Sequence, residues 1–172
     1  MTETAFAHFT NGEPDIKRFE ALAEVFRNNS DGIVEIKNTK GLGGDDVLGL
    51  VSSDLERMGF KIERSKKAED QIVFSASSEV GESNFHVDGY HPGWDYILEV
   101  EGGRRDSIYK DFLKGLLLKE ASTLVLAVPS SYDYGRETPQ SDKQFKRAKR
   151  EAAAIHDSSR FDSPCDIVVI GY

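Results

Sequence analysis

The feature that most constrains the fold is an unbroken apolar run, Leu124–Val128, which Pro129 closes. Five residues are enough for a strand, and a strand with no polar residue on either face is typical of a sheet covered on both sides. A second run of this kind, Ile167–Ile170, lies near the end of the sequence. Together the two runs predict a sheet that helices flank on both faces.

The remaining segments supply those helices and further strands. Apolar residues at three- and four-residue spacing predict helices over 15–27, 45–58, 106–120 and 143–156. The third helix, which Asp106 would cap, is expected to bury one apolar stripe: Ile108, Tyr109, Phe112, Leu113, Leu116 and Leu117. Alternating or β-prone residues predict strands over 60–62, 71–76, 85–90 and 95–101, and a short strand or extended link over 33–36.

This order of elements predicts an α/β fold with a mixed β-sheet flanked by helices. The length of 172 residues suits a single domain over 1–172, with its core at about 45–128. Hydrophobic residues make up 38% of the sequence, and no apolar stretch is long enough for a membrane span. No secretory signal is recognisable, and the single cysteine, Cys165, excludes an internal disulfide and a cysteine zinc site. These features favour a cytoplasmic protein without a membrane partner.

Three acids in the segment 85–101 are the main functional signal. Asp88 ends one predicted strand, and Glu99 and Glu101 lie two residues apart on the next, so their side chains share a face. Acids beside Leu98 and Val100 are costly to bury unless a partner compensates their charge. A Mg²⁺ ion is a natural partner, because it binds a few carboxylates together with water and phosphate oxygens. The alternative is a solvated sheet face, with Asp88 as a turn residue.

The spacing of these acids resembles the PD-(D/E)XK nuclease superfamily. In that signature an acid on one strand is followed by an acid, any residue and a lysine on the next strand, as in Asp88, ten residues, then Glu99-Val100-Glu101. The predicted elements over 45–128 also resemble the restriction-endonuclease-like αβββαβ core of the superfamily. The resemblance implies a metal-dependent endonuclease that hydrolyses DNA, with Mg²⁺ or Mn²⁺ bound by Asp88, Glu99 and Glu101.

Glu101 departs from the signature, because it stands where the superfamily has lysine. It resembles in this respect the BamHI-like restriction enzymes, and it would then orient the attacking water or accept its proton. A basic group would come from the following helix, where Lys110 and Lys114 are available, or from Arg104 and Arg105 before it. We take Lys110 as the catalytic candidate; the alternative is that all four are solvated surface charges.

The formal net charge of −8 argues against a protein that binds nucleic acid by overall charge. Contact with DNA would therefore need a local basic face. The predicted face comprises Arg104, Arg105 and, on the helix 143–156, Lys143, Lys146, Arg147 and Arg150. An ordinary solvated helix face is the alternative for the last four. Double-strand cutting would favour a homodimer, since two cuts need two sites related by symmetry.

Several other interpretations stay open. His86 and His91 flank Asp88 and could form a histidine-carboxylate metal site, although His86 more often has a structural role. An extra acid could come from a helix, from Glu20, Glu35 or Glu56. Glycoside hydrolysis by a carboxylate pair is another option. The main rival is a nuclease-fold protein that no longer cuts and serves as a nucleic-acid-binding or structural partner.

Overall fold

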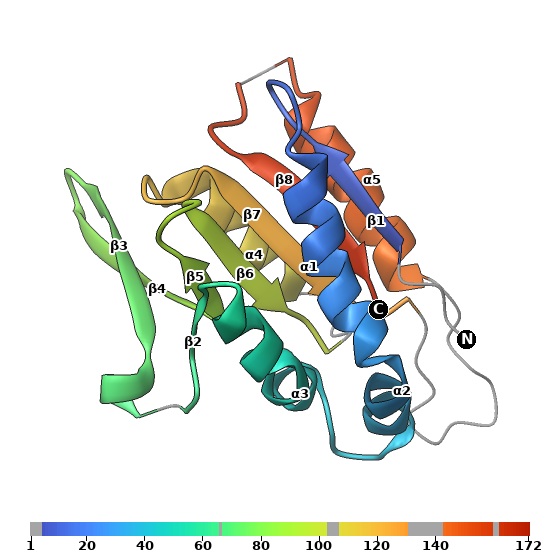
Figure 1. The fold of residues 1–172 in the computed structure, drawn as a ribbon. Helices are drawn as coiled ribbons and strands as arrows, with labels where there is room; N and C mark the ends of the chain where they lie inside the picture. Colours follow the sequence, from blue (N-terminus) through green and yellow to red (C-terminus); the bar gives the residue numbers. More distant parts are fainter. Residues whose placement is uncertain (1–4, 66, 103–106, 131–142, 160–161) are drawn as a thin grey trace.

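The computed structural model describes residues 5–65, 67–102, 107–130, 143–159 and 162–172 (Figure 1). Its helices are α1 (Ile16–Asn28), α2 (Ser30–Asn38), α3 (Gly44–Arg57), α4 (Ser107–Leu117) and α5 (Lys143–His156). Its strands are β1 (Ala5–Phe9), β2 (Lys61–Ile62), β3 (Ile72–Ser78), β4 (Gly81–Val87), β5 (Gly89–His91), β6 (Tyr96–Val100), β7 (Thr123–Val128) and β8 (Asp166–Gly171). None of these helices is long and apolar enough to span a membrane.

A six-stranded mixed sheet lies at the centre, in the order β1-β8-β7-β6-β5-β2. β6, β7 and β8 run parallel, whereas β1, β5 and β2 are each antiparallel to a neighbour. The two apolar runs of the sequence are β7 and β8, and every residue of β7 is buried. The predicted α/β fold with a helix-flanked mixed sheet is therefore confirmed.

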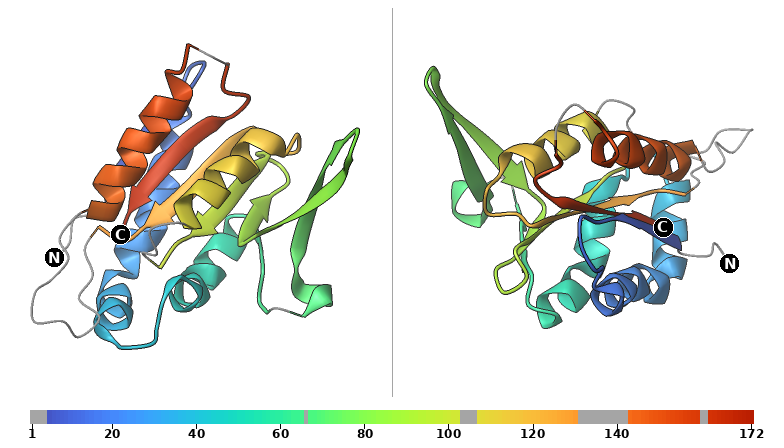
Figure 2. Two further views of the ribbon diagram at one scale, coloured as in Figure 1. Left: turned by 180° about the vertical axis from the view of Figure 1, so that it is seen from behind. Right: turned by 90° about the horizontal axis from the view of Figure 1, so that it is seen from above.

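Helices cover both faces of this sheet (Figure 2). Alternation along the central strands sends Leu98 and Val125 into the core beneath α1 and α3. Ile97 and Leu124 point the other way, into the core beneath α4 and α5. The sheet is buried on both sides as a result, which is the arrangement that its unbroken apolar strands require.

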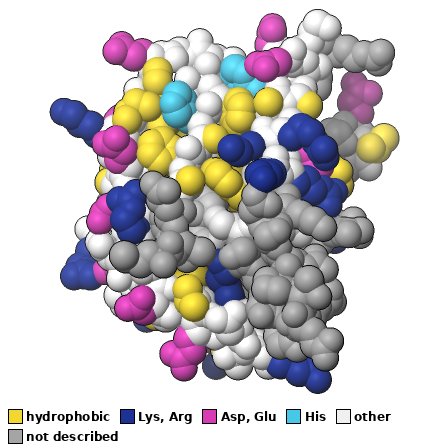
Figure 3. All heavy atoms as spheres, turned by 90° about the vertical axis from the view of Figure 1, so that its right-hand side faces the viewer, with side chains coloured by type: hydrophobic (Ala, Val, Ile, Leu, Met, Phe, Trp, Pro, Cys, Tyr) yellow, Lys and Arg dark blue, Asp and Glu magenta, His cyan; other side chains and the backbone are white. Residues whose placement is uncertain are grey.

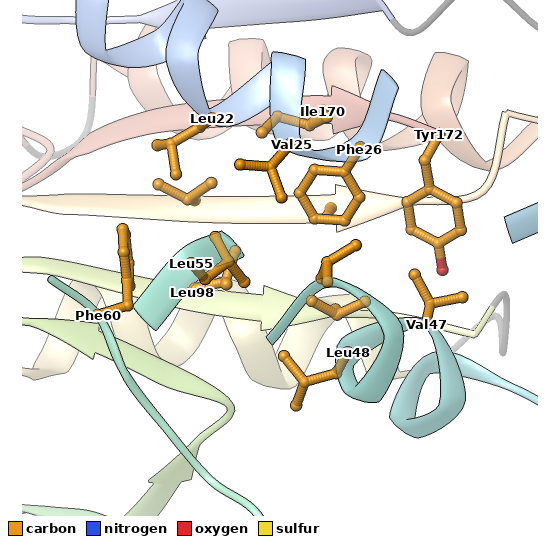
Figure 4. Close-up of a cluster of buried hydrophobic side chains, with 14 of the residues drawn as sticks. Leu22, Val25, Phe26, Val47, Leu48, Leu55, Phe60, Leu98, Ile170 and Tyr172 are labelled. Atoms are coloured by element: carbon orange, nitrogen blue, oxygen red, sulfur yellow. The ribbon is translucent and has the colours of Figure 1, made fainter. Parts of the chain in front are cut away.

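The core on the α1 and α3 side is tightly interdigitated. Figure 4 shows Leu55 of α3 beside Leu98 of β6, with Leu22 and Phe26 of α1 in the same core near Ile170 of β8. The ring of Phe26 stacks on that of Tyr172 with 5.6 Å between their centroids. This packing fixes α3 against β6 and so positions one wall of the candidate site described below.

The segment 33–36, predicted as a strand or extended link, is instead part of helix α2, so that prediction was wrong. Ile33 and Lys37 are buried at helical spacing. A Cβ on Gly32 would lie 2.8 Å from a methyl group of Leu50, which shows how closely α2 packs on α3. A short apolar run fits a strand or a helix equally well, and tertiary packing decided here.

The strands differ from the prediction in two places. β1 was not predicted, and it pairs with β8 at the edge of the sheet. The predicted strand 85–90 is split, because β4 ends at Val87 and β5 begins at Gly89, with Asp88 at the bend. β3 and β4 form a separate two-stranded arm that projects from the body (Figures 1 and 2).

Candidate active site

The end of β6 carries two of the three predicted acids. Glu99 lies in a core strand and is almost fully buried, with 3% of its surface exposed, although it is an acid. Glu101 follows the strand and is half-buried. Its backbone N–H donates to the carbonyl of Ala127 over 2.9 Å, and its carbonyl accepts a hydrogen bond from the Tyr172 hydroxyl. Two hydrogen bonds therefore hold the backbone of Glu101 in place just after β6.

Asp88 lies beside Glu99. The antiparallel register of β5 and β6 pairs Gly89 with Leu98, and its continuation by one position places Asp88 opposite Glu99. Residues opposite each other in such a pair have Cβ atoms about 5 Å apart. The backbone N–H of Val100 donates to Oδ2 of Asp88 over 2.7 Å and fixes its carboxylate at this edge. The structure thus brings together the two acids that the sequence placed on neighbouring strands.

Helix α4 supplies the positive charge, but through a face that the apolar stripe did not predict. Tyr109, Leu113 and Leu117 are 48%, 48% and 46% exposed, so the prediction that they are buried was wrong. A Cβ on Gly115 would lie 3.0 Å from the side chain of Leu124, so this glycine lets α4 approach β7 closely. The buried face of α4 includes Gly115 together with Asp111 and Phe112.

Lys114 and Asp111 reach the acids from this helix. The ammonium Nζ of Lys114 lies 2.6 Å from Oε2 of Glu99 and 3.0 Å from Oδ1 of Asp111. Asp111 is 2% exposed, and the Lys114 side chain is 16% exposed. Lys110, the predicted catalytic lysine, is exposed to solvent. The lysine that the structure brings to Glu99 is therefore Lys114, four residues further along the helix.

The cluster carries more negative than positive charge. Among the described residues, Lys114 is the cation that pairs with Glu99 and Asp111, and its charge also acts on Asp88. Oε1 of Glu99 and Oδ2 of Asp111 are buried and have no hydrogen-bond partner in the described part of the chain. Buried polar atoms without partners are costly, so this cluster favours a ligand that supplies positive charge.

The ionisation of these groups reflects the same imbalance. Burial raises the pKa of Asp88 to about 6, against a downward pull from the Val100 N–H and Lys114. Burial and then the charge of Asp88 raise the pKa of Glu99 well above its usual range. Burial alone would lower the pKa of Lys114, but Glu99 and Asp111 outweigh it and the net shift is upward. Acids with raised pKa values in one cluster are typical of functional sites.

Asp88 also faces an open cleft of about 340 Å³ between α3 and the chain that follows β2. Asp45 of α3 and Glu63 line this cleft, and the charge of Asp45 adds to the upward shift of the Asp88 pKa. Arg64 also lines it, but its guanidinium is paired with Glu56. A ligand in the cleft would reach Asp88 from solvent, with Glu99 behind it.

These residues fit a divalent cation in part. In the described ranges no three histidine, cysteine, aspartate or glutamate side chains are already arranged as a metal site, so the trio with Glu101 is not assembled. Asp88 and Glu99 do lie together, and Oε1 of Glu99 has no hydrogen-bond partner among the described residues. Mg²⁺ commonly takes one or two carboxylates and completes its shell with water and substrate phosphate, so two acids are enough.

The other acids and histidines proposed for the site lie elsewhere. His91 has both ring nitrogens occupied, by the carbonyl of Met58 at 2.9 Å and the N–H of Trp94 at 3.1 Å, and it stacks on the Trp94 ring. His86 is exposed on the β3–β4 arm. Glu20 and Glu35 are exposed on α1 and α2, and Glu56 is paired with Arg64. His91 is therefore a structural residue.

The predicted DNA-contacting residues are only partly described. Arg104 and Arg105 lie outside the described residues, as does the side chain of Lys143. Lys146 and Arg150 are exposed on α5, whereas Arg147 hydrogen-bonds to Glu151 and to the Tyr109 hydroxyl. Figure 3 looks at the side of the molecule where α5 and β1 lie, and lysine and arginine side chains gather there. Arg147 is thus engaged within the chain, and Arg150 also lies 3.9 Å from Glu151.

Sequence reasoning missed four members of this region: Asp45, Glu63, Asp111 and Lys114 as the close cation. The sequence shows an Asp–Lys pair three residues apart, at 111 and 114. The apolar stripe of this helix predicted a different buried face, which left the pair out. A comparison with protein-family models, with curated proteins and with solved structures finds no match to this chain.

Proposed function

We propose that this chain is a metal-dependent endonuclease that hydrolyses phosphodiester bonds in DNA and has a restriction-endonuclease-like core. One observation carries the proposal: Asp88 and Glu99 lie side by side at a strand edge, and the Lys114 ammonium lies 2.6 Å from Glu99. Two acids and one lysine are the groups that the superfamily resemblance implies. Here α4 supplies the lysine in place of position 101.

The residues divide the work as follows. Asp88 and Glu99 would hold Mg²⁺ or Mn²⁺, and a bound ion of this kind polarises a phosphate and makes water more acidic. The Lys114 ammonium would stabilise the negative charge that develops on the phosphate oxygens. Asp88, with a pKa of about 6, would be mostly ionised and ready to bind a cation at neutral pH. Glu101, half-buried just beyond, keeps its predicted role of orienting water or accepting a proton.

The surroundings leave room for a large substrate. The cleft beside Asp88 opens to solvent, so a strand of DNA could bring a phosphate to the acids. The exposed basic residues of α5, Lys146 and Arg150, lie across the sheet from α3 and the cleft, so they would contact phosphates only of a DNA that passes around the sheet edge. Cutting both strands would call for a homodimer.

The rival proposal is a nuclease-fold protein that binds partners without cutting. It is favoured by the missing lysine at position 101 and by the absence of a ready three-acid metal group in the described residues. The buried oxygens of Glu99 and Asp111 argue against it. A protein with no cation to bind would gain stability by losing those charges.

The test is incubation of the purified protein with plasmid and with single-stranded DNA, in Mg²⁺, Mn²⁺ or a chelator. We expect cleavage with either metal and none with chelator. Glu99→Gln and Lys114→Met should abolish it, whereas Lys110→Met should cut like the parent. Loss of cleavage in Lys110→Met but not in Lys114→Met would restore the sequence-based assignment. No cleavage of any DNA in either metal would favour the non-cutting rival.

A further inference from the structure

Lys114 has two acidic partners where an ion pair needs one. Besides Glu99, its Nζ contacts Oδ1 of Asp111 at 3.0 Å. Only 4% of the Asp111 side chain is exposed, so this second carboxylate is as deeply buried as Glu99, whose side chain is 5% exposed. A buried second acid weakens the protein unless it has a task that Glu99 cannot perform.

That task becomes visible when the partners of Lys114 are compared. Glu99 is a proposed cation ligand, so a bound divalent cation and the Lys114 ammonium would compete for one carboxylate and repel each other. Lysine has a flexible four-carbon stem, and the Lys114 side chain is already 16% exposed. With Glu99 as its sole partner, Lys114 would be free to swing into solvent as the cation bound.

Asp111 differs from Glu99 in how it is tied to Lys114. It lies three residues before Lys114 on α4, and residues at this spacing are neighbours on a helix surface. Their separation is therefore set by the helix and does not depend on what Glu99 binds. The burial of Asp111 also keeps water from screening the attraction.

We propose that Asp111 is a positioning residue that retains Lys114 in the site when a divalent cation binds Asp88 and Glu99. The inference rests on the proposed function and deepens it, because it explains how one site keeps two cations of the same sign close together. Asp111 acts through Lys114 and need not touch the cation or the DNA.

The test measures where Lys114 is, independently of cleavage. The full chain is treated with acetic anhydride in Mn²⁺ or in chelator, and acetylation of Lys114 is quantified by mass spectrometry against exposed Lys110 on the same helix. In the parent, Lys114 should stay protected in both conditions. In Asp111→Asn it should stay protected in chelator, through Glu99, and become several-fold more reactive in Mn²⁺.

A matched control removes an acid from another helical pair of the same spacing. Asp54 pairs with Arg57 on α3, so Asp54→Asn should leave Lys114 protected with and without Mn²⁺. If Lys114 in Asp111→Asn reacts equally in Mn²⁺ and chelator, Asp111 is merely structural and the inference is overturned. Protection of Lys114 in Asp111→Asn under both conditions would overturn it as well.

Activity provides a second readout. Asp111→Asn should cut about 10–100-fold more slowly, as expected for a group that orients a residue of the site. Mn²⁺ binding by calorimetry separates the two proposals. If Mn²⁺ releases Lys114 in Asp111→Asn but the parent cuts no DNA, the nuclease proposal alone is refuted. If the parent does not bind Mn²⁺, both proposals are refuted.

Discussion

Replacing the Asp88 carboxylate with an amide should stabilise the metal-free protein at neutral pH. Asp88→Asn keeps an oxygen that accepts the hydrogen bond from Val100 and removes the buried charge. The Asp88 pKa of about 6 in the folded protein, against 3.8 for a free side chain, corresponds to roughly 3 kcal/mol. The new amide also needs hydration, so the measured gain should be about 1–3 kcal/mol.

The pH dependence of this gain identifies its cause. Because the folded pKa of Asp88 is raised, its favourable contribution is complete below the unfolded pKa and is lost as pH rises through about 6. Asparagine does not titrate. The stability difference between Asp88→Asn and the parent should therefore be near zero at about pH 4 and reach its full size above about pH 7.

Urea unfolding in chelator at about pH 4.5 and about pH 7.5 measures the difference, at low protein concentration because the isoelectric point is about 5.0. Asp54→Asn is the control of opposite sign, since the hydrogen bond from Asn29 and the pairing with Arg57 lower the pKa of Asp54. Added Mg²⁺ should stabilise the parent and not Asp88→Asn. A variant that is less stable than the parent at neutral pH, or equally shifted at both pH values, would refute the argument.

Three further predictions concern other parts of the molecule. Gly115→Ala should be about 1–3 kcal/mol less stable than Gly49→Ala in urea, because a Cβ at 115 meets β7 while one at 49 meets nothing within 4 Å; equal stabilities would remove the reason given for the orientation of α4. Changing Lys146 and Arg150 together to glutamine should lower the salt slope of DNA binding by about 1–2 units, and an unchanged slope would return α5 to an ordinary solvated surface. Glu101→Gln should reduce cleavage and leave most Mn²⁺ affinity intact by calorimetry; cleavage at the parental rate would exclude a role for Glu101 in activating water.

The sequence predicts best where one pattern has one structural solution. The unbroken apolar runs of β7 and β8 are of strand length, are rich in β-branched residues and, for β7, end at Pro129, so they favoured strands buried on both faces and indicated the class of fold. The superfamily signature related Asp88 to Glu99, and the structure brings them together because Asp88 immediately precedes β5, whose start pairs antiparallel with the end of β6. Local periodicity and strand order carry that much information.

The lysine could not be chosen in the same way, because it depends on how α4 is turned about its axis. Residues four apart on a helix differ by roughly 40° in direction. That angle separates exposed Lys110 from Lys114, which contacts Glu99. Which of the two lysines faces Glu99 depends on how α4 packs on β7, where Gly115 lies close to Leu124, a long-range contact that no periodicity reports. The helical state of 33–36 was hidden for the same reason, since it depends on packing against α3.

The β3–β4 arm has a consequence for how this fold can change. The chain leaves the sheet after β2 and returns at β5, and the two ends of this excursion are joined, since the N–H of Glu63 donates to the carbonyl of Asp88 over 2.9 Å. Ile62 and Gly89 are paired beside that bond. The arm is thus a closed detour whose entry and exit meet at one point. The outer part of the arm can therefore be lengthened, shortened or replaced without moving Asp88, because the contacts that position Asp88 lie at the base of the arm.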